Sequence, residues 1–66
     1  MIEEYKGKIF SLYLRKYFEI QYEVFCYGNG YLLCTREFKS KEEALVFFEQ
    51  KVVEAIALET WWSYYE

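Results

Sequence analysis

A capping signal followed by an unbroken run of helix-forming residues most limits how this 66-residue chain can fold. Ser40 precedes Glu43 by three residues, the spacing of a capping box, in which each side chain accepts a hydrogen bond from the other residue's backbone N–H. From there to Tyr65 the sequence contains neither glycine nor proline. This pattern predicts one helix from about Lys41 to about Tyr64, more than a third of the chain.

Two stretches typical of strands precede the predicted helix. Apolar side chains at 20, 22, 24 and 26 alternate with Glu19, Gln21 and Glu23, the period of a strand with one buried face. The segment 28–30, Gly-Asn-Gly, tolerates the positive φ angles of a tight turn, and residues 31–38 then return as a second strand. We therefore expect a β-hairpin immediately before the helix.

The first third of the chain fits two secondary structures. Apolar residues at 10, 12 and 14 alternate as in a strand, whereas those at 10, 13, 14, 17 and 18 have helical spacing. Gly7 and the density of β-forming residues favour a strand. The expected fold is therefore α+β, a single domain over residues 1–66. It has a three-stranded antiparallel sheet with one long C-terminal helix packed on one face (β-β-β-α), and the alternative order is α-β-β-α.

At 100° per residue the predicted helix carries three apolar stripes. The first is the natural face for the sheet and contains Leu45, Phe48, Val52, Ala55 and Ile56. The second lies beside it and contains Phe47, Leu58, Trp61 and Tyr65. The third has the alternating four- and three-residue spacing of a helix–helix seam and contains Val46, Gln50, Val53, Ala57, Thr60 and Tyr64.

The helix is also expected to outrun the sheet. Glu59 stands where the sheet-facing stripe needs its next apolar residue. The 18 residues from Lys41 to Leu58 span about 27 Å, which is the length of a strand of eight or nine residues. The aromatic residues after Glu59 should then project beyond the sheet.

The aromatic content predicts a subunit interface. Eight Tyr, six Phe and two Trp make up 24% of the chain, more than one small core can cover. We expect a small protein-interaction module that forms a homodimer, the commonest oligomer, through its C-terminal helix. A half-solvated helix face is the alternative explanation of the third stripe. The residues expected to self-associate are Val46, Val53, Ala57, Trp61, Trp62, Tyr64 and Tyr65.

Several kinds of chemistry lack their usual residues. The chain has no His, Asp or Pro and only two Cys, whereas a structural zinc site needs about four Cys or His ligands. Without His, the hydroxyl nucleophiles lack their usual activating base, and no spacing pairs two Glu carboxylates. We expect no enzymatic activity, no metal and no cofactor.

The net charge of −3 is unevenly distributed. Residues 1–41 carry seven Lys/Arg against five Glu, and residues 42–66 carry one Lys against six Glu. An acidic helix face could bind a basic surface on another protein, as an inhibitor or adaptor encoded by a virus or a mobile element would. A solvated helix face is the alternative. The acidic residues concerned are Glu42, Glu43, Glu49 and Glu54.

The outward face of the sheet offers a second hypothesis, a nucleic-acid-binding domain. Aromatic and basic side chains together can stack on and attract single-stranded nucleic acid. Glu19 and Glu23 on the same face oppose this, and a dimer surface would explain the aromatic residues equally. The candidate residues are Tyr13, Arg15, Tyr17, Phe25, Tyr27 and Arg36.

A short string at the start of the predicted helix carries a resemblance. Residues 37–48, EFKSKEEALVFF, resemble the strand-to-helix junction of integrase arm-type and AP2-like DNA-binding domains. They are also similar to the last junction of double-stranded RNA-binding domains. The resemblance covers a dozen residues and restates the capping box. Glu42 and Glu43 stand where those families have basic residues, so no functional residue is carried over.

The remaining signals concern location and the two cysteines. The N-terminus is acidic and lacks the apolar segment of a signal peptide, and the longest apolar run, ALVFF, is too short to span a membrane. A cytoplasmic protein without membrane contact is expected. Such a location disfavours a disulfide, so Cys26 and Cys34 should be reduced core residues. A three-residue turn would offset them diagonally, a two-residue turn would place them on opposite faces, and a longer turn could oppose them directly.

Overall fold

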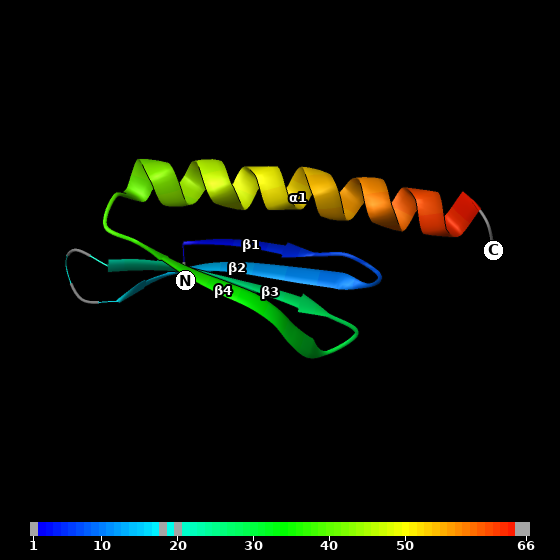
Figure 1. The fold of residues 1–66 in the computed structure, drawn as a ribbon, viewed down its shortest axis with the longest axis horizontal. Helices are drawn as coiled ribbons and strands as arrows, with labels where there is room; N and C mark the ends of the chain where they lie inside the picture. The colour runs from blue at the N-terminus through cyan, green and yellow to red at the C-terminus, as the bar shows by residue number, and fades with distance from the viewer. Residues whose placement is uncertain (1, 18, 20, 65–66) are drawn as a thin grey trace.

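The computed structural model describes residues 2–17, 19 and 21–64, with side chains through residue 61. Four strands precede one helix: β1 (Glu3–Lys6), β2 (Phe10–Tyr17), β3 (Gln21–Gly28), β4 (Tyr31–Phe38) and α1 (Lys41–Tyr64) (Figure 1). The strands form one antiparallel sheet in the order β1-β2-β3-β4. The helix lies along one face of this sheet, and its C-terminal end extends past the β1–β2 turn.

The predicted α+β arrangement is confirmed, and the number of strands is corrected from three to four. The alternative α-β-β-α order is wrong, because residues 10–17 form β2. The missed strand, β1, pairs with β2 from Glu3 opposite Leu14 to Lys6 opposite Ser11. It has only four residues, of which Tyr5 alone is partly buried. A strand this short and charged shows no apolar alternation in the sequence.

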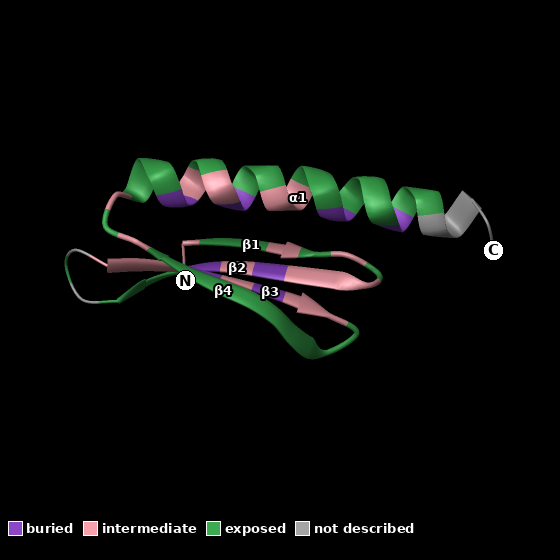
Figure 2. Cartoon of the chain, in the orientation of Figure 1, coloured by how far each residue is buried: buried purple, intermediate pink, exposed green. Residues whose placement is uncertain are grey.

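The core lies between the middle of the sheet and the helix (Figure 2). Leu12 and Leu14 on β2 pair with Cys26 and Val24 on β3, so the four side chains form one buried patch. Ala44, Phe48 and Ala55 of α1 pack against that patch. Two of the three helical residues are alanines, and their small side chains let the helix backbone approach the sheet closely.

The buried stripe of α1 differs from the predicted one at both ends. Phe48 and Ala55 are buried as expected, but Ala44 takes the place of Leu45, which is only half-buried. Ile56 is 47% exposed, whereas Glu59 is buried. The helix is therefore rotated so that Ala44, Ala55 and the Glu59 carboxylate face the sheet. The sequence prediction placed the large apolar residues Leu45 and Ile56 against the sheet instead.

A bulge in β4 changes the register of the predicted hairpin. The turn has two residues, Asn29 with φ 52° and Gly30 with φ 83°, and Gly28 pairs with Tyr31. The register then shifts beside Cys26 and Tyr27, because Leu33 is an extra residue on β4. The pairing that results is Cys26 opposite Cys34 and Val24 opposite Arg36.

Candidate interaction surfaces

The outer surface of α1 carries an apolar stripe bordered by carboxylates. Val46 and Val53 are 55% and 66% exposed, and Ala57 is exposed on the same side. A shallow groove along this stripe is lined by Val46, Val53, Gln50, Glu49 and Glu54. The third predicted stripe therefore faces away from the sheet from Val46 to Thr60, the part whose side chains the structure describes. We call Val46, Gln50, Val53 and Ala57 the outer helix stripe.

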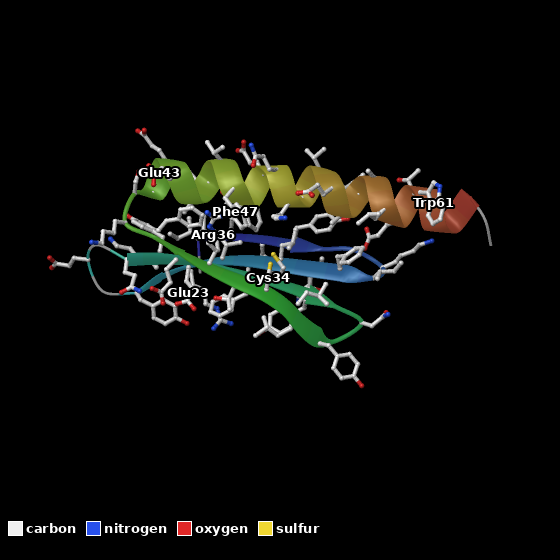
Figure 3. All side chains as sticks on the ribbon, viewed as in Figure 1. Glu23, Cys34, Arg36, Glu43, Phe47 and Trp61 are labelled. Carbon is white, nitrogen blue, oxygen red and sulfur yellow. The ribbon has the colours of Figure 1, made fainter. Side chains whose placement is uncertain are left out.

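All four predicted acidic residues, Glu42, Glu43, Glu49 and Glu54, are exposed. Glu43 lies in the first turn of α1 (Figure 3). Its backbone N–H donates to Ser40 Oγ at 3.4 Å, as the capping box requires. The second bond of a capping box, from the Ser40 backbone N–H to the Glu43 carboxylate, is not formed between these two residues. Glu54 forms an ion pair with Lys51 of the same helix at 3.4 Å. The acidic residues therefore flank the outer helix stripe on both sides.

The aromatic end of the helix is described only in part. Trp61 is 56% exposed and lies near the end of α1 (Figure 3). Of Trp62 and Tyr64 the structure describes the backbone, which is helical. Their side chains and all of Tyr65 lie outside the described part, so the predicted interface at these three residues stays a prediction.

The outer sheet face gathers four of the six residues predicted for it. Tyr13 and Phe25 are cross-strand partners, and the Tyr13 and Tyr27 rings meet edge to face with centroids 5.8 Å apart. The Arg15 guanidinium carbon lies 5.3 Å from the Phe25 ring centroid and 6.0 Å from that of Tyr13. We call Tyr13, Arg15, Phe25 and Tyr27 the aromatic–Arg cluster. Tyr17 follows on β2 with the same alternation and is exposed.

The prediction that Arg36 belongs to this outer face is wrong. Its guanidinium carbon lies 5.3 Å from the Phe47 ring centroid and 5.7 Å from that of Phe38, between β4 and α1 (Figure 3). If the strands paired from the two-residue turn onward without a bulge, Arg36 would lie opposite Glu23 on the outer face. The extra residue Leu33 moves Arg36 opposite Val24 and so turns its side chain toward the helix.

The charge of the outer sheet face does not favour a polyanion. Glu23 is the cross-strand partner of Arg15 and accepts a hydrogen bond from Thr35 Oγ1 at 3.3 Å. Glu37 is the partner of Glu23 on β4, and Glu4 is the partner of Tyr13 on β1. Lys6 forms an ion pair with Glu4 at 3.5 Å. On these pairings carboxylates outnumber basic groups around the aromatic–Arg cluster.

The buried carboxylate of Glu59 joins α1 to the β1–β2 turn. The sequence alone assigned no contact to this residue. Tyr5 Oη donates to Glu59 Oε1 at 2.6 Å, and the backbone N–H groups of Ile9 and Phe10 donate to Oε2 at 2.8 and 2.9 Å. We call these three hydrogen bonds the Glu59 anchor. The signals in the sequence were Glu59 itself, on the sheet-facing stripe, and Gly7, which leaves space for its carboxylate.

The charge state of the Glu59 carboxylate follows from its hydrogen-bond partners. Burial acts to raise the pKa of Glu59, but the bonds from Phe10, Tyr5 and Ile9, with the charge of Lys8, outweigh burial and lower it. The pKa of Tyr5 is raised because its hydroxyl donates to the carboxylate. Glu59 is therefore an ionised structural group near neutral pH, with each oxygen already hydrogen-bonded.

The described residues contain no candidate metal site and no candidate membrane-spanning helix. Within residues 2–17, 19 and 21–64, no three His, Cys, Asp or Glu side chains lie together as metal ligands would. No helix of this part of the chain is long and apolar enough to cross a membrane. Comparisons with protein-family models, with curated proteins and with solved structures give no match.

Proposed function

We propose that this chain is a non-enzymatic protein-interaction module that forms a homodimer through the outer helix stripe. The carrying observation is the exposure of Val46 and Val53, seven residues apart, at the centre of the surface that faces away from the sheet. A helix packed on a single sheet needs only one apolar face, and α1 already uses Phe48 and Ala55 for that purpose. A second copy would cover the remaining apolar stripe.

The total surface of the chain supports the same proposal. A monomer of 8.2 kDa exposes about 4,500 Å² according to the scaling of surface with mass, whereas this chain exposes 5080 Å². The excess is about 500 Å², whereas each partner contributes roughly 800 Å² to a standard interface.

The carboxylates beside the stripe give the proposed dimer a recognisable salt dependence. In a parallel pair along the outer helix stripe, Glu49 of one chain lies near Glu54 of the other. In an antiparallel pair the equivalent flanks face each other, so Glu49 lies toward Glu49 and Glu54 toward Glu54. Lys51 compensates Glu54 only in part, because the pair is exposed to solvent. Added salt screens like charges, so dimerisation should strengthen as salt rises. Binding of a basic protein or of nucleic acid by charge attraction would weaken instead.

The first test replaces both valines of the stripe. Sedimentation of the wild type over about two decades of concentration should show a monomer–dimer equilibrium, because its apolar stripe is uncovered in the monomer. The double variant Val46→Ser, Val53→Ser should weaken dimerisation at least about tenfold, since a two-fold interface loses four buried valines. Both positions are exposed in the monomer, so the circular dichroism spectrum should not change.

The matched control is Tyr31→Ser, which removes a side chain 76% exposed at the start of β4. This variant should dimerise as the wild type does, because Tyr31 lies on the sheet and not on the outer helix stripe. A wild type that stays monomeric at every concentration and salt contradicts the proposal. Dimerisation that survives in the valine variant places the interface elsewhere and equally contradicts it.

A second candidate function, binding of single-stranded nucleic acid, rests on the aromatic–Arg cluster. The edge-to-face rings and the stacked guanidinium form a preassembled surface for bases. In mobility-shift assays at low salt, the wild type should bind single-stranded RNA or DNA. The double variant Arg15→Gln, Tyr27→Ser should bind at least about tenfold more weakly, because it loses a stacking group and a charge. The valine variant above is the control, and an absence of any shift at low salt removes this candidate.

A further inference from the structure

The two cysteines occupy directly opposed positions on neighbouring strands. The bulge at Leu33 brings Cys34 of β4 opposite Cys26 of β3, so both side chains lie on the helix-facing side of the sheet. Both cysteines line one apolar depression between β4 and α1, together with Leu33, Ala55 and Leu58. Directly opposed residues of antiparallel strands have Cα atoms about 4.5–5.5 Å apart, which is within the range that a disulfide spans.

The two thiols differ in access to solvent and in reactivity. Cys26 is 6% exposed within the core, whereas Cys34 is exposed. Burial, followed by the hydrogen bond and the charge of Cys34, raises the pKa of Cys26 to about 12. A thiolate is the attacking species in thiol–disulfide exchange, and it must be reached by the reagent. Cys34 is therefore the thiol that reacts first, and Cys26 is placed to react second.

We propose that Cys26 and Cys34 are a modification site at which a small soluble disulfide forms a reversible bond between β3 and β4. The Cys34 thiolate attacks one sulfur of the small disulfide, forms a mixed disulfide and releases one small thiolate. Cys26 then gives up its proton and attacks the Cys34 sulfur, which releases the second small thiolate. The protein loses two electrons and two protons, and the small disulfide is reduced to two thiols.

The bond would act on the least protected strand of the sheet. Along β4 every residue from Tyr31 to Glu37 is exposed, and β4 is an edge strand of the sheet. A covalent link to β3 closes a short loop through the turn at Asn29 and Gly30 and so opposes separation of the two strands. Oxidation should therefore slow the local opening of β4 and leave β1, at the other edge, unaffected.

The experiment exposes the reduced full-length protein to oxidised glutathione under denaturant-free conditions. The intact mass should fall by about 2 Da, both thiols should become resistant to alkylation, and reduced glutathione should reverse both changes. Amide hydrogen exchange in β4 should slow at least about threefold on oxidation, with no change in β1. Cys34→Ser should give no loss of 2 Da.

A displaced-thiol variant tests whether the direct opposition matters. In Cys34→Ser, Thr35→Cys the number of thiols is unchanged, but the second thiol lies opposite Phe25 on the outer face of the sheet. This variant should end as a stable glutathione adduct, without an internal bond. A stable glutathione adduct on wild-type Cys34, or disulfides only between chains, would overturn the proposal. So would equally rapid internal bond formation in the displaced-thiol variant.

Discussion

Glu59→Ala is expected to reduce the free energy of unfolding by about 2–4 kcal/mol. The substitution leaves the Ile9 and Phe10 N–H groups and the Tyr5 hydroxyl without their acceptor at a part-buried position. Hydrogen bonds to charged groups contribute about 1.5–3 kcal/mol each, and an unsatisfied buried donor carries a further cost, although water will reach some of these groups. A domain of this length has a total stability of roughly 3–10 kcal/mol, so the loss is a large fraction of the total and should lower the urea midpoint clearly.

Glu54→Ala is the matched control for this loss. Glu54 is an exposed glutamate of the same helix, and its ion pair with Lys51 at 3.4 Å is accessible to water. Exposed pairs contribute about 0–1 kcal/mol, so this variant should unfold near the wild-type urea concentration. Equal midpoints for Glu59→Ala and the wild type in urea denaturation would show that the anchor contributes nothing to stability.

The same carboxylate gives the wild type a characteristic acid response. The pKa of Glu59 is lower in the folded chain than in the unfolded chain, so its ionisation stabilises the fold fully above the unfolded pKa, about 4.3–4.5. This contribution should decline as the pH falls from there through the folded pKa. Glu59→Gln keeps the side-chain shape but does not titrate, so its free energy of unfolding should change less over that pH range.

Gly7→Ala is expected to destabilise the fold by nearly as much as the loss of the anchor, about 2–4 kcal/mol. A Cβ atom on Gly7 would lie well inside van der Waals contact of the Glu59 carboxylate, and the three nearest heavy atoms all belong to that side chain. The end of a glutamate could ordinarily move aside. Here it is held by Tyr5, Ile9 and Phe10, so any such movement breaks the anchor.

A double-mutant cycle separates this explanation from a general intolerance of alanine at position 7. In the Glu59→Ala background the obstructing atoms are gone, so adding Gly7→Ala should cost less than about 0.5 kcal/mol. The two variants are therefore expected to be strongly non-additive in urea denaturation. Additive losses would mean that Gly7 is required for its backbone and not for the space that it leaves to Glu59.

The parts of the fold that follow from local signals could be predicted from the sequence. The capping residues Ser40 and Glu43 and the absence of Gly and Pro locate the helix, and Asn29-Gly30 locates the turn. These features depend on neighbouring residues alone. β1 depends instead on pairing with β2 and on the contact between Tyr5 and Glu59, 54 positions away in the chain. No local pattern encodes a partner at that distance.

The candidate surfaces also contain some residues that local signals place correctly and others that they do not. Val46 and Val53 were placed correctly on the outer side of α1, because helical period alone fixes their position relative to Phe48 and Ala55. Arg36 was misplaced, because its side of the sheet depends on a bulge that no glycine or proline marks. Glu59 was recognised as an exception on an apolar stripe, but its three hydrogen-bond donors come from a turn that only the folded chain brings near.

The bulge at Leu33 also limits which insertions and deletions this part of the chain can accept. Side chains alternate between the two faces of a strand, so one residue more or less before Cys34 exchanges inside for outside along the rest of β4. Arg36 and Phe38 would then leave the helix, and Thr35 and Glu37 would turn toward it. Insertions and deletions between Gly28 and Cys34 should therefore be tolerated in even numbers, or when a second bulge restores the alternation.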